Sequence, residues 1–500
     1  MAIEKIAKAM SWSVVARVTR FAAGIAANII IVRSLGAHGW GVLSVLKSFV
    51  GFAFVMIMLG LGNAMLKYTP AMRVRGAVGR FFDTFKRLIL LQVGVWLLLL
   101  ILTRLFSEDL DSIYAGRIEH FSYYLFFAIA FVLFEVFMVL ITNMLQSWYE
   151  TKSLALVIFY SNIGYIVILM LFIKSGFGII GILAAGGIVN LAASLALFPT
   201  VRNLFHSEAS TGDASVGVGK IMKFSLPFVV TGILNQIVWR QSEVIFLGHF
   251  HGAELAGFFG LAYRFPQLLL EFIPLTIWPI VMAGTSEAYE EDAANLPKAI
   301  ELYYKLLYIL VIPVAALGFA ISKSIIPILY GETMAPAALF AQLFFVVFSY
   351  SFLYTPLSLA LYVLEKSWVN MIIFLILAVV NVGLDLALIP KYGLWGAFIP
   401  VSIVLLLGVF LFFYALRRFR KDVRVPVFFI AKCYAAAIPA FLIAVADAKW
   451  SSPFAVALQF IAGAVLLVAG FRFFKVIGSE EKELMLRLPI PFKEKIVAIF

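Results

Sequence analysis

Residues 11–32 read SWSVVARVTRFAAGIAANIIIV, residues 33–40 read RSLGAHGW, and residues 41–60 read GVLSVLKSFVGFAFVMIMLG. Each outer segment has about the 20 mainly apolar residues that a helix needs to cross the hydrocarbon core of a bilayer. The short middle segment has the glycine and polar residues of a turn. The stretch therefore predicts two membrane-spanning helices joined by a tight turn around Gly36.

The same pattern recurs along the whole chain. Its 500 residues are 63% hydrophobic and 13% charged, with a mean hydropathy of +1.04, whereas soluble domains are about half apolar and a quarter charged. Apolar runs and their breaks predict fourteen spans, near 11–35, 40–64, 84–104, 121–147, 153–174, 177–201, 217–248, 255–283, 300–330, 335–364, 368–390, 393–416, 427–446 and 451–474. Fourteen spans take roughly 280 residues, which excludes a large soluble enzyme module. We expect an all-α polytopic membrane protein.

Basic residues set the predicted orientation, because Lys and Arg in short loops stay cytoplasmic. Of the 39 Lys and Arg, 26 lie in the loops and termini assigned to the cytoplasm and seven in the outward loops. Both termini are then cytoplasmic, in a cytoplasmic (inner) membrane. Arg17 and Arg20 interrupt what would be the core of a signal peptide, so the first helix is retained. The net charge of +12 is read as this topology signal and predicts no nucleic-acid partner.

An internal repeat divides the chain. A shift of 215 residues pairs several loop residues, and one inserted residue adds a further pair: Glu150 with Glu365, Gly178 with Gly393, Gly181 with Gly396, and Gly41 with Gly257. Six helices per repeat predict two bundles related by a pseudo-two-fold axis along the membrane normal, around a central cavity. The predicted domains are a six-helix bundle at 1–205, a linker at 206–216, a second bundle at 217–416, two additional spans at 417–478 and an amphipathic cytoplasmic tail at 479–500.

Charges inside spans are the candidate functional residues, because an unpaired charge at the bilayer centre costs about 2.5–3.5 kcal/mol on insertion scales. Arg17, Arg20, Gly24 and Asn28 form one helical stripe. The predicted substrate-binding residues are Arg20, Asn28, Lys47, Arg240, Glu243 and Arg264. Simpler interpretations stay open: Arg17 reaches cytoplasmic headgroups, Arg240 pairs with Glu243, and Arg264 is neutralised by Glu271.

Two further acids, Glu135 and Asp385, are candidate ion-coupling residues, although a Ser or Asn on a neighbour would satisfy each equally well. No cofactor, metal site or catalytic residue is predicted. The sequence has no G-x-x-x-x-G-K-[ST] motif for ATP. Its histidines lie in loops or at span edges, and its single cysteine, Cys433, lies in an apolar run.

Four segments carry a family resemblance: RSLGAHGWGVLS at 33–44, AYRFP at 262–266, LEK at 364–366 and YGLWGA at 392–397. With them the chain resembles the multidrug/oligosaccharidyl-lipid/polysaccharide (MOP) flippase superfamily, and within it the polysaccharide transporter branch, whose members have fourteen spans. The resemblance implies a flippase rather than an enzyme. It implies as partners a polyprenyl-diphosphate-linked oligosaccharide substrate, membrane lipids and other polysaccharide assembly proteins.

Three rival functions remain at the level of sequence. A drug or cation antiporter of the same superfamily is expected to have a cavity dominated by carboxylates, whereas the stripe residues here are mainly basic. A membrane-embedded glycan polymerase or ligase needs an outer catalytic loop, and the longest outward connection, about 104–120, is short. The third alternative is a scaffold protein within a polysaccharide assembly complex, and the sequence does not distinguish it from a transporter.

The predicted topology is testable by reporter fusions or cysteine labelling after residues 75, 210 and 420. All three positions are expected to read cytoplasmic, because they lie in basic loops. One outward reading contradicts the fourteen-span topology.

Overall fold

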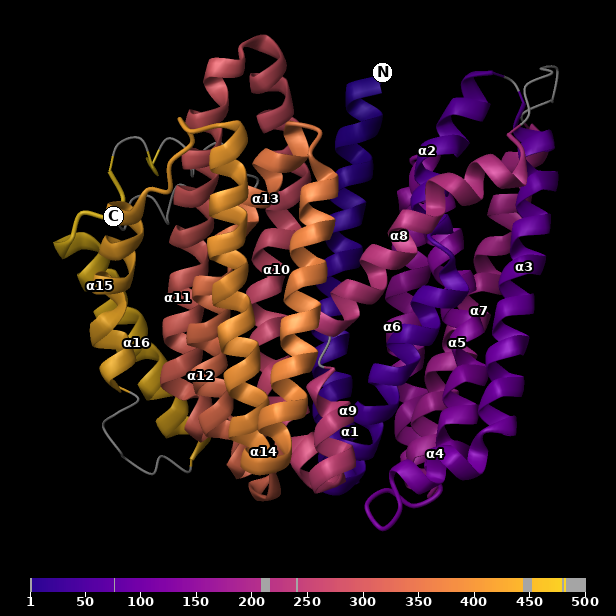
Figure 1. The fold of residues 1–500 in the computed structure, drawn as a ribbon, viewed down its shortest axis with the longest axis horizontal. Coiled ribbons are helices and arrows are strands. Elements are labelled where there is room, and N and C mark those ends of the chain that lie inside the picture. The colour runs from indigo at the N-terminus through magenta and orange to yellow at the C-terminus, as the bar shows by residue number, and fades with distance from the viewer. Residues whose placement is uncertain are drawn as a thin grey trace. The chain divides into compact units, whose positions relative to one another are not determined.

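The computed structural model describes residues 2–75, 77–207, 216–239, 242–443, 452–478 and 481–482. In this part of the chain every regular element is a helix (Figure 1). The α-helices are α1 (Ala2–Met58), α2 (Leu61–Val74), α3 (Val78–Leu105), α4 (Ser107–Ile113), α5 (Phe121–Ser147), α6 (Thr151–Lys174), α7 (Gly178–Ser207), α8 (Val218–Trp239), α9 (Glu243–His251), α10 (Ala253–Glu291), α11 (Leu296–Tyr330), α12 (Ala335–Ser351), α13 (Tyr354–Val363), α14 (Ser367–Phe419), α15 (Val427–Ile443) and α16 (Pro453–Phe473).

The helices confirm an all-α polytopic membrane protein. Ten helical stretches among the described residues are long and apolar enough to cross a membrane. Two of them, Ala16–Val74 and Ser367–Phe419, each contain two predicted spans. Each of the fourteen predicted ranges overlaps a helix, but three of them, 40–64, 217–248 and 335–364, are each divided between two helices.

Glycines bend the two longest helices where the sequence predicts turns. Gly36 in α1 has φ 64° and ψ −172°, and Gly393 in α14 has φ 52° and ψ −122°. Left-handed backbone costs other L-residues roughly 1–2 kcal/mol, so glycine allows the chain to reverse there. Gly252 and Gly178 also have positive φ, of 94° and 56°. Gly36 pairs with Gly252 and Gly178 pairs with Gly393 under the predicted repeat of 215 residues, to within one residue. Superposition of 11–201 on 217–416 as a whole stays a prediction.

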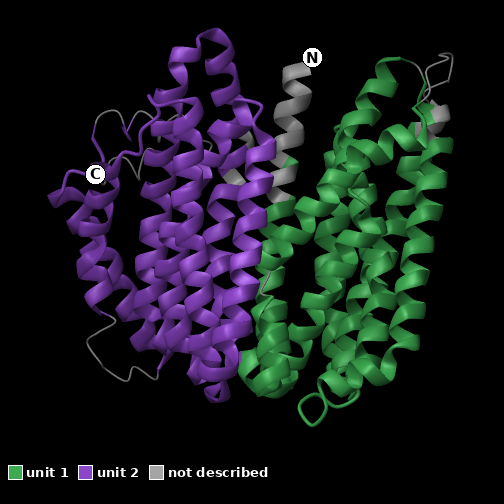
Figure 2. Cartoon of the chain, viewed as in Figure 1, with its two compact units in different colours: residues 1–257 green, residues 258–500 purple. Residues whose placement is uncertain are grey.

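Two compact units make up the chain: unit 1, Met1–Gly257, and unit 2, Phe258–Phe500 (Figure 2). This division differs from the predicted boundaries at 205 and 217, because α8 packs with the helices that precede it. Gly232 of α8 lies against Val55 of α1, and Gly60 lies against the backbone of Ser225. The two units are defined by packing, whereas the six-helix bundles at 1–205 and 217–416 were predicted from a sequence repeat. The division into units therefore does not test the bundles, which stay a prediction.

Polar side chains join helices inside unit 1. The Trp96 indole on α3 donates to the carbonyl of Ile129 on α5 at 2.8 Å, and Gln92 donates to the carbonyl of Met58 at 3.2 Å. At the other end of the unit, Tyr114 donates to the carbonyl of Ile245 on α9 at 3.2 Å. These bonds satisfy groups that lipid would leave unpaired. They join α3 to α1 and α5, and they join the end of α4 to α9.

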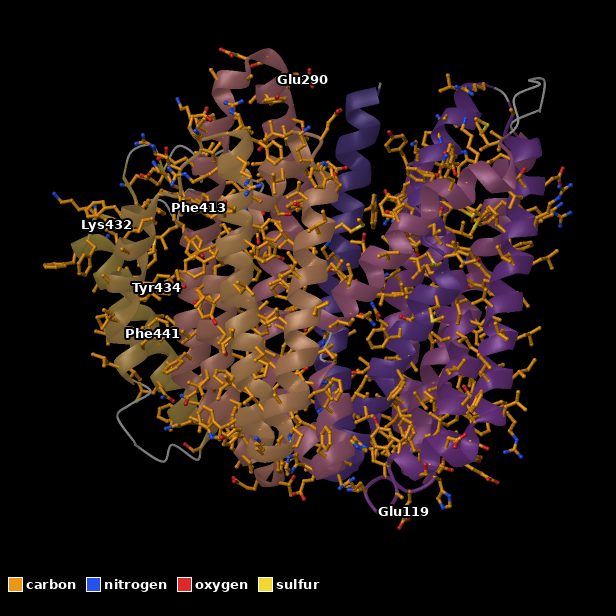
Figure 3. The ribbon with its side chains drawn as sticks, in the orientation of Figure 1. Glu119, Glu290, Phe413, Lys432, Tyr434 and Phe441 are labelled. Atoms are coloured by element: carbon orange, nitrogen blue, oxygen red, sulfur yellow. The ribbon has the colours of Figure 1, made fainter. Side chains whose placement is uncertain are left out.

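In unit 2, α12, α15 and α16 pack around α11. Tyr434 on α15, labelled in Figure 3, shares a 2.8 Å hydrogen bond with the Ser349 hydroxyl of α12. Gln459 of α16 donates to the carbonyl of Ala320 on α11 at 2.9 Å. The last two helices, predicted as additional spans, are therefore held to α11 and α12 by buried polar bonds.

The chain after α16 returns to unit 2. Glu481 forms an ion pair with Lys305 of α11 at 3.0 Å. Burial raises the pKa of Glu481, but the hydrogen bond from Lys305, the backbone hydrogen bonds and the charge of Lys305 together outweigh this and leave the pKa below its ordinary value. Because the pKa of Glu481 is lower in the folded than in the unfolded protein, its ionised carboxylate stabilises the folded protein at any pH above the unfolded-state pKa. This stabilisation is lost as the pH falls through the folded-state pKa. Except for Glu481 and Lys482, the predicted amphipathic tail lies outside the described residues.

Within unit 1 a reciprocal contact joins α1 to the start of α10. A Cβ atom on Gly41 would meet the carbonyl oxygen of Ala253, and one on Gly257 would meet that of Ala37. The residues of each pair, 37/253 and 41/257, are separated by the same number of positions, as the predicted repeat requires. Two equivalent helix segments thus touch backbone to backbone, which only glycine permits.

Gly41→Ala and Gly257→Ala are expected to destabilise the protein by about 1–3 kcal/mol, because the added methyl group has no space. Gly94→Ala in α3 is the control, since nothing lies within 4 Å of the added carbon there. The melting temperature in detergent measures the effect. An equal melting temperature for Gly41→Ala and the control contradicts a close contact at Gly41.

Candidate functional site

The polar stripe of α1 is accessible. Arg17, Arg20 and Gly24 are exposed and Asn28 is partly exposed, whereas Ala27 and Ile31, which follow Gly24 on the same face at steps of three and four, are buried. The predicted stripe is therefore accessible from Arg17 to Gly24, and its face becomes buried further along the helix.

Glu135 of α5 lies within electrostatic reach of two of the predicted cations. Its carboxylate interacts electrostatically with Lys47 and with Arg20, both on α1. Arg20 also interacts electrostatically with Arg17, which lies one helical turn earlier in α1. The side chain of Glu135 keeps an exposed surface although protein surrounds its carboxylate on most sides. We define the polar cluster of unit 1 as Arg17, Arg20, Lys47 and Glu135.

Lys47 is held by an aromatic ring. Its Nζ lies 5.3 Å from the ring centroid of Trp40, about two helical turns earlier in α1. The indole is 4% exposed and so has little freedom to move. A cation over an aromatic face is stabilised by roughly 0.5–2 kcal/mol. This contact places the ammonium group without neutralising it.

The polar cluster carries more positive than negative charge, with three basic side chains and one acid. Coulomb attraction is stronger where water is partly excluded, so the cluster is suited to bind an anion. Arg20 supplies a planar fork that matches phosphate or carboxylate oxygens, and Lys47 supplies a compact charge.

Span seven differs from its prediction. The range 217–248 was expected as one helix with Gln236, Arg240 and Glu243 on one face, but α8 ends at Trp239 and α9 begins at Glu243. Gln236 lies against Gly51 of α1. Glu243 is 1% exposed, and Arg240 lies outside the described residues. The stripe includes Arg240 and so stays a prediction, and the described residues show only that α8 and α9 are separate helices.

Arg264 belongs to a chain of hydrogen bonds on α10, inside unit 2. Its Nη1 donates to Oε1 of Gln267 at 2.9 Å, and Nε2 of Gln267 donates to Oε1 of Glu271 at 2.8 Å. The expected neutralisation of Arg264 by Glu271 is thus indirect, through an amide that the sequence analysis did not identify. The spacing of three and four residues was a readable signal for it.

The second candidate coupling acid, Asp385 on α14, is completely buried. Asn381, one turn earlier on the same helix, donates to its Oδ2 at 3.2 Å. The interpretation that an Asn partly satisfies this acid is therefore supported, with the donor on its own helix. Among the described residues, no group of three or more His, Cys, Asp and Glu side chains is arranged to hold a metal ion.

The structure brings together Arg20, Lys47 and Glu135, which the sequence analysis had assigned to separate roles. Arg264 and Asp385 lie in unit 2 with their own partners. Asn28 lies on the same helix as Arg20, two turns further along. A contact between α1 and α5 at this point was not predictable, because nothing in the sequence relates position 135 to positions 20 and 47.

Comparison with known proteins gives one family and several related folds. The model of the family described as polysaccharide biosynthesis protein matches residues 6–283. No curated protein matches the chain.

Three solved structures have a similar fold. The lipid II flippase MurJ in an inward closed conformation is 17% identical, with a TM-score of 0.69, over 93% of this chain and 98% of that one. An inward-facing multidrug resistance MATE family transporter of the MOP superfamily is 16% identical, with a TM-score of 0.62, over 81% and 96%. A MOP superfamily transporter from Pyrococcus furiosus is 16% identical, with a TM-score of 0.57, over 83% and 95%.

Glu135→Gln is expected to tighten the binding of inorganic diphosphate to the purified protein by about 3- to 30-fold, because one negative charge is removed beside Arg20 and Lys47. The gain should shrink at high salt. Isothermal titration calorimetry measures it. Glu108→Gln on the exposed helix α4 is the control, and the same affinity for both variants contradicts the electrostatic role of Glu135.

Proposed function

Because the chain belongs to the polysaccharide biosynthesis protein family and has the fold of the MOP superfamily, we propose that it is a flippase for a polyprenyl-diphosphate-linked oligosaccharide. It moves this lipid from the cytoplasmic to the outer leaflet by alternating access. It lies in the cytoplasmic membrane with both termini in the cytoplasm, and it transports its substrate without a covalent step.

The observation that carries the proposal is the polar cluster of unit 1. Arg20 and Lys47 act on one carboxylate, Glu135, within membrane-spanning helices. Charges are expensive at this depth unless they serve a partner or a passing ligand. An excess of cations supports an anionic cargo.

A diphosphate loses hydration when it enters the membrane, so cations must replace the water that it gives up. Arg20 does this with two parallel N–H donors and Lys47 with a rotating ammonium group. Arg264 of α10 is the third cation among the proposed substrate-binding residues. Asn28 and Glu243 bind hydroxyl groups of the glycan, and the polyprenyl tail stays in lipid. Arg240 completes the proposed substrate-binding residues.

Glu135 and Asp385 are the proposed coupling acids. Glu135 is the better placed of the two, because it acts directly on the cations proposed to hold the diphosphate. A proton or cation that binds there changes the net charge of the polar cluster, and with it the affinity for an anion.

The charge balance disfavours the rival antiporter. A cationic drug would add positive charge to a cluster that already has an excess of it, at a cost that grows as water is excluded. Nothing in the described part of the chain favours the polymerase, ligase or scaffold alternatives.

Arg20→Gln and Lys47→Gln are each expected to slow flipping of a fluorescent polyprenyl-diphosphate oligosaccharide in proteoliposomes by about 10- to 100-fold. Each loses a charge-assisted hydrogen bond worth roughly 1.5–3 kcal/mol. Dithionite quenching of the probe in each leaflet measures the rate.

Lys174→Gln is the matched control, since this exposed lysine ends α6 in the same unit. It should flip at the rate of the wild type. Unchanged flipping in both Arg20→Gln and Lys47→Gln, at normal expression and melting temperature, refutes the proposed site. Flipping of a neutral lipid-linked glycan at the same rate refutes the substrate class.

A further inference from the structure

A basic surface lies in unit 1 where α2 packs beside the start of α8 (Figure 1). The sequence of residues 61–75 and 217–239, which form these helices and their ends, contains five Lys and Arg and no Asp or Glu. All five basic side chains are exposed: Lys67, Arg73, Arg75, Lys220 and Lys223. The two helices therefore present positive charge on a surface separate from the polar cluster.

Aromatic rings from both helices order one of these lysines. The Nζ of Lys67 on α2 lies 4.0 Å from the ring centroid of Phe224 on α8 and 5.5 Å from that of Tyr68. The two rings pack edge to face, with 5.5 Å between their centroids. A cation is attracted to the face of a ring but keeps its charge. The contacts thus place the ammonium group at the junction of the two helices.

The lysines of α8 gather around the same ring. Lys220 precedes Phe224 by four residues and Lys223 by three, and residues at these steps are neighbours on a helix surface. Lys220 therefore lies close to the ring that Lys67 contacts. We define the basic junction as Lys67, Lys220, Lys223 and Phe224.

An apolar surface continues from the basic junction along both helices. Phe228 follows Phe224 by one turn of α8, with 5.3 Å between the ring centroids, and it is exposed. A Cβ atom on Gly60, just before α2, would meet the Cβ of Phe228. Because α2 approaches Phe228 at its start and Phe224 at Lys67, it runs antiparallel to α8 here. Both helices thus carry their lysines toward one end and apolar surface toward the other.

This order of charge and apolar surface matches the edge of a bilayer. Lys67 follows the second predicted span, 40–64, and Lys220 lies in the first turn of α8, which is long and apolar enough to cross a membrane. Basic side chains at the ends of spans lie near the phosphates of the lipid headgroups, where anionic lipids attract them. A ligand that fits has an anionic head and an apolar tail.

We propose that the basic junction binds the phosphate of an anionic glycerophospholipid of the surrounding membrane, whose acyl chain lies against Phe228. This inference goes beyond the proposed function, because it concerns a lipid that stays with the protein and not the cargo. A polyprenyl diphosphate has the same general chemistry, but the polar cluster proposed to bind it lies within spans, whereas the basic junction lies at their ends. Since its lysines come from α2 and α8, the bound phosphate also joins the two helices.

The experiment titrates phosphatidylglycerol into the full-length protein in detergent. Native mass spectrometry measures the dissociation constant of the first bound lipid, and the melting temperature is measured with and without the lipid. The double variant Lys67→Gln, Lys220→Gln is expected to bind about five- to twentyfold more weakly, because it loses two charge-assisted hydrogen bonds to the phosphate. Its affinity should also depend less on salt than that of the wild type. The lipid should raise the melting temperature of the wild type but not that of the variant.

Two further double variants are the controls. Lys152→Gln with Lys174→Gln removes two exposed charges at the ends of α6 in the same unit, and it should bind within about twofold of the wild type if the effect is local and not one of net charge. Lys67→Arg with Lys220→Arg keeps both charges and should also bind within about twofold. A loss in either control as large as in Lys67→Gln, Lys220→Gln overturns the proposal, and so does unchanged binding in that variant.

Three other ligands identify the source of the phosphate. Phosphatidylcholine, which has a phosphate but no net charge, is expected to bind more weakly than phosphatidylglycerol, and equal binding overturns the proposal. Glycerol 1-phosphate has no acyl chain, so displacement of the lipid by an equal concentration of it shows a site for free phosphate and contradicts a lipid site. Displacement by an equal concentration of farnesyl diphosphate shows that the basic junction takes the proposed cargo. That result refutes the resident lipid while the proposed function stands.

Discussion

The hydrocarbon core of a bilayer leaves no polar group without a partner, and this constraint orders the whole molecule. Helices satisfy the backbone, glycines provide the turns, and the few charges inside spans must find partners or water. Arg20 and Lys47 act on Glu135, Arg264 binds Gln267, and Asp385 accepts from Asn381. Because such partners are few, each one marks a place where the chain accepts a cost in insertion.

Most of the fold was predictable because its signals are local. Hydropathy and length predicted the spans, and the resemblance to the MOP superfamily is confirmed by the family match and by the fold. The reversals at Gly36 and Gly393 were expected from the sequence, since glycine is the residue that tolerates positive φ. The break between Trp239 and Glu243 was missed, because an apolar run gives no sign of a helix that stops and restarts within it. The packing of α8 onto α1 and α2 depends on side-chain shape across helices, which hydropathy does not report.

The site was predictable only in part, because some of its contacts join helices that are far apart in the sequence. The stripe of Arg17, Arg20 and Asn28 follows from helical spacing along one helix. The association of Glu135 with that stripe joins residues more than 80 positions apart, so it required the packed structure. Gln267 was within reach of sequence reasoning, since it lies between Arg264 and Glu271 on the same face. It was overlooked because an uncharged side chain was not counted among the candidates.

The two polar groups treat charge in complementary ways. In unit 1 several cations share a single acid, and in unit 2 an amide separates one cation from one acid. The cluster of unit 1 has three basic side chains and one acid, so under the proposed function an anionic headgroup is the ligand that brings its charges closer to balance.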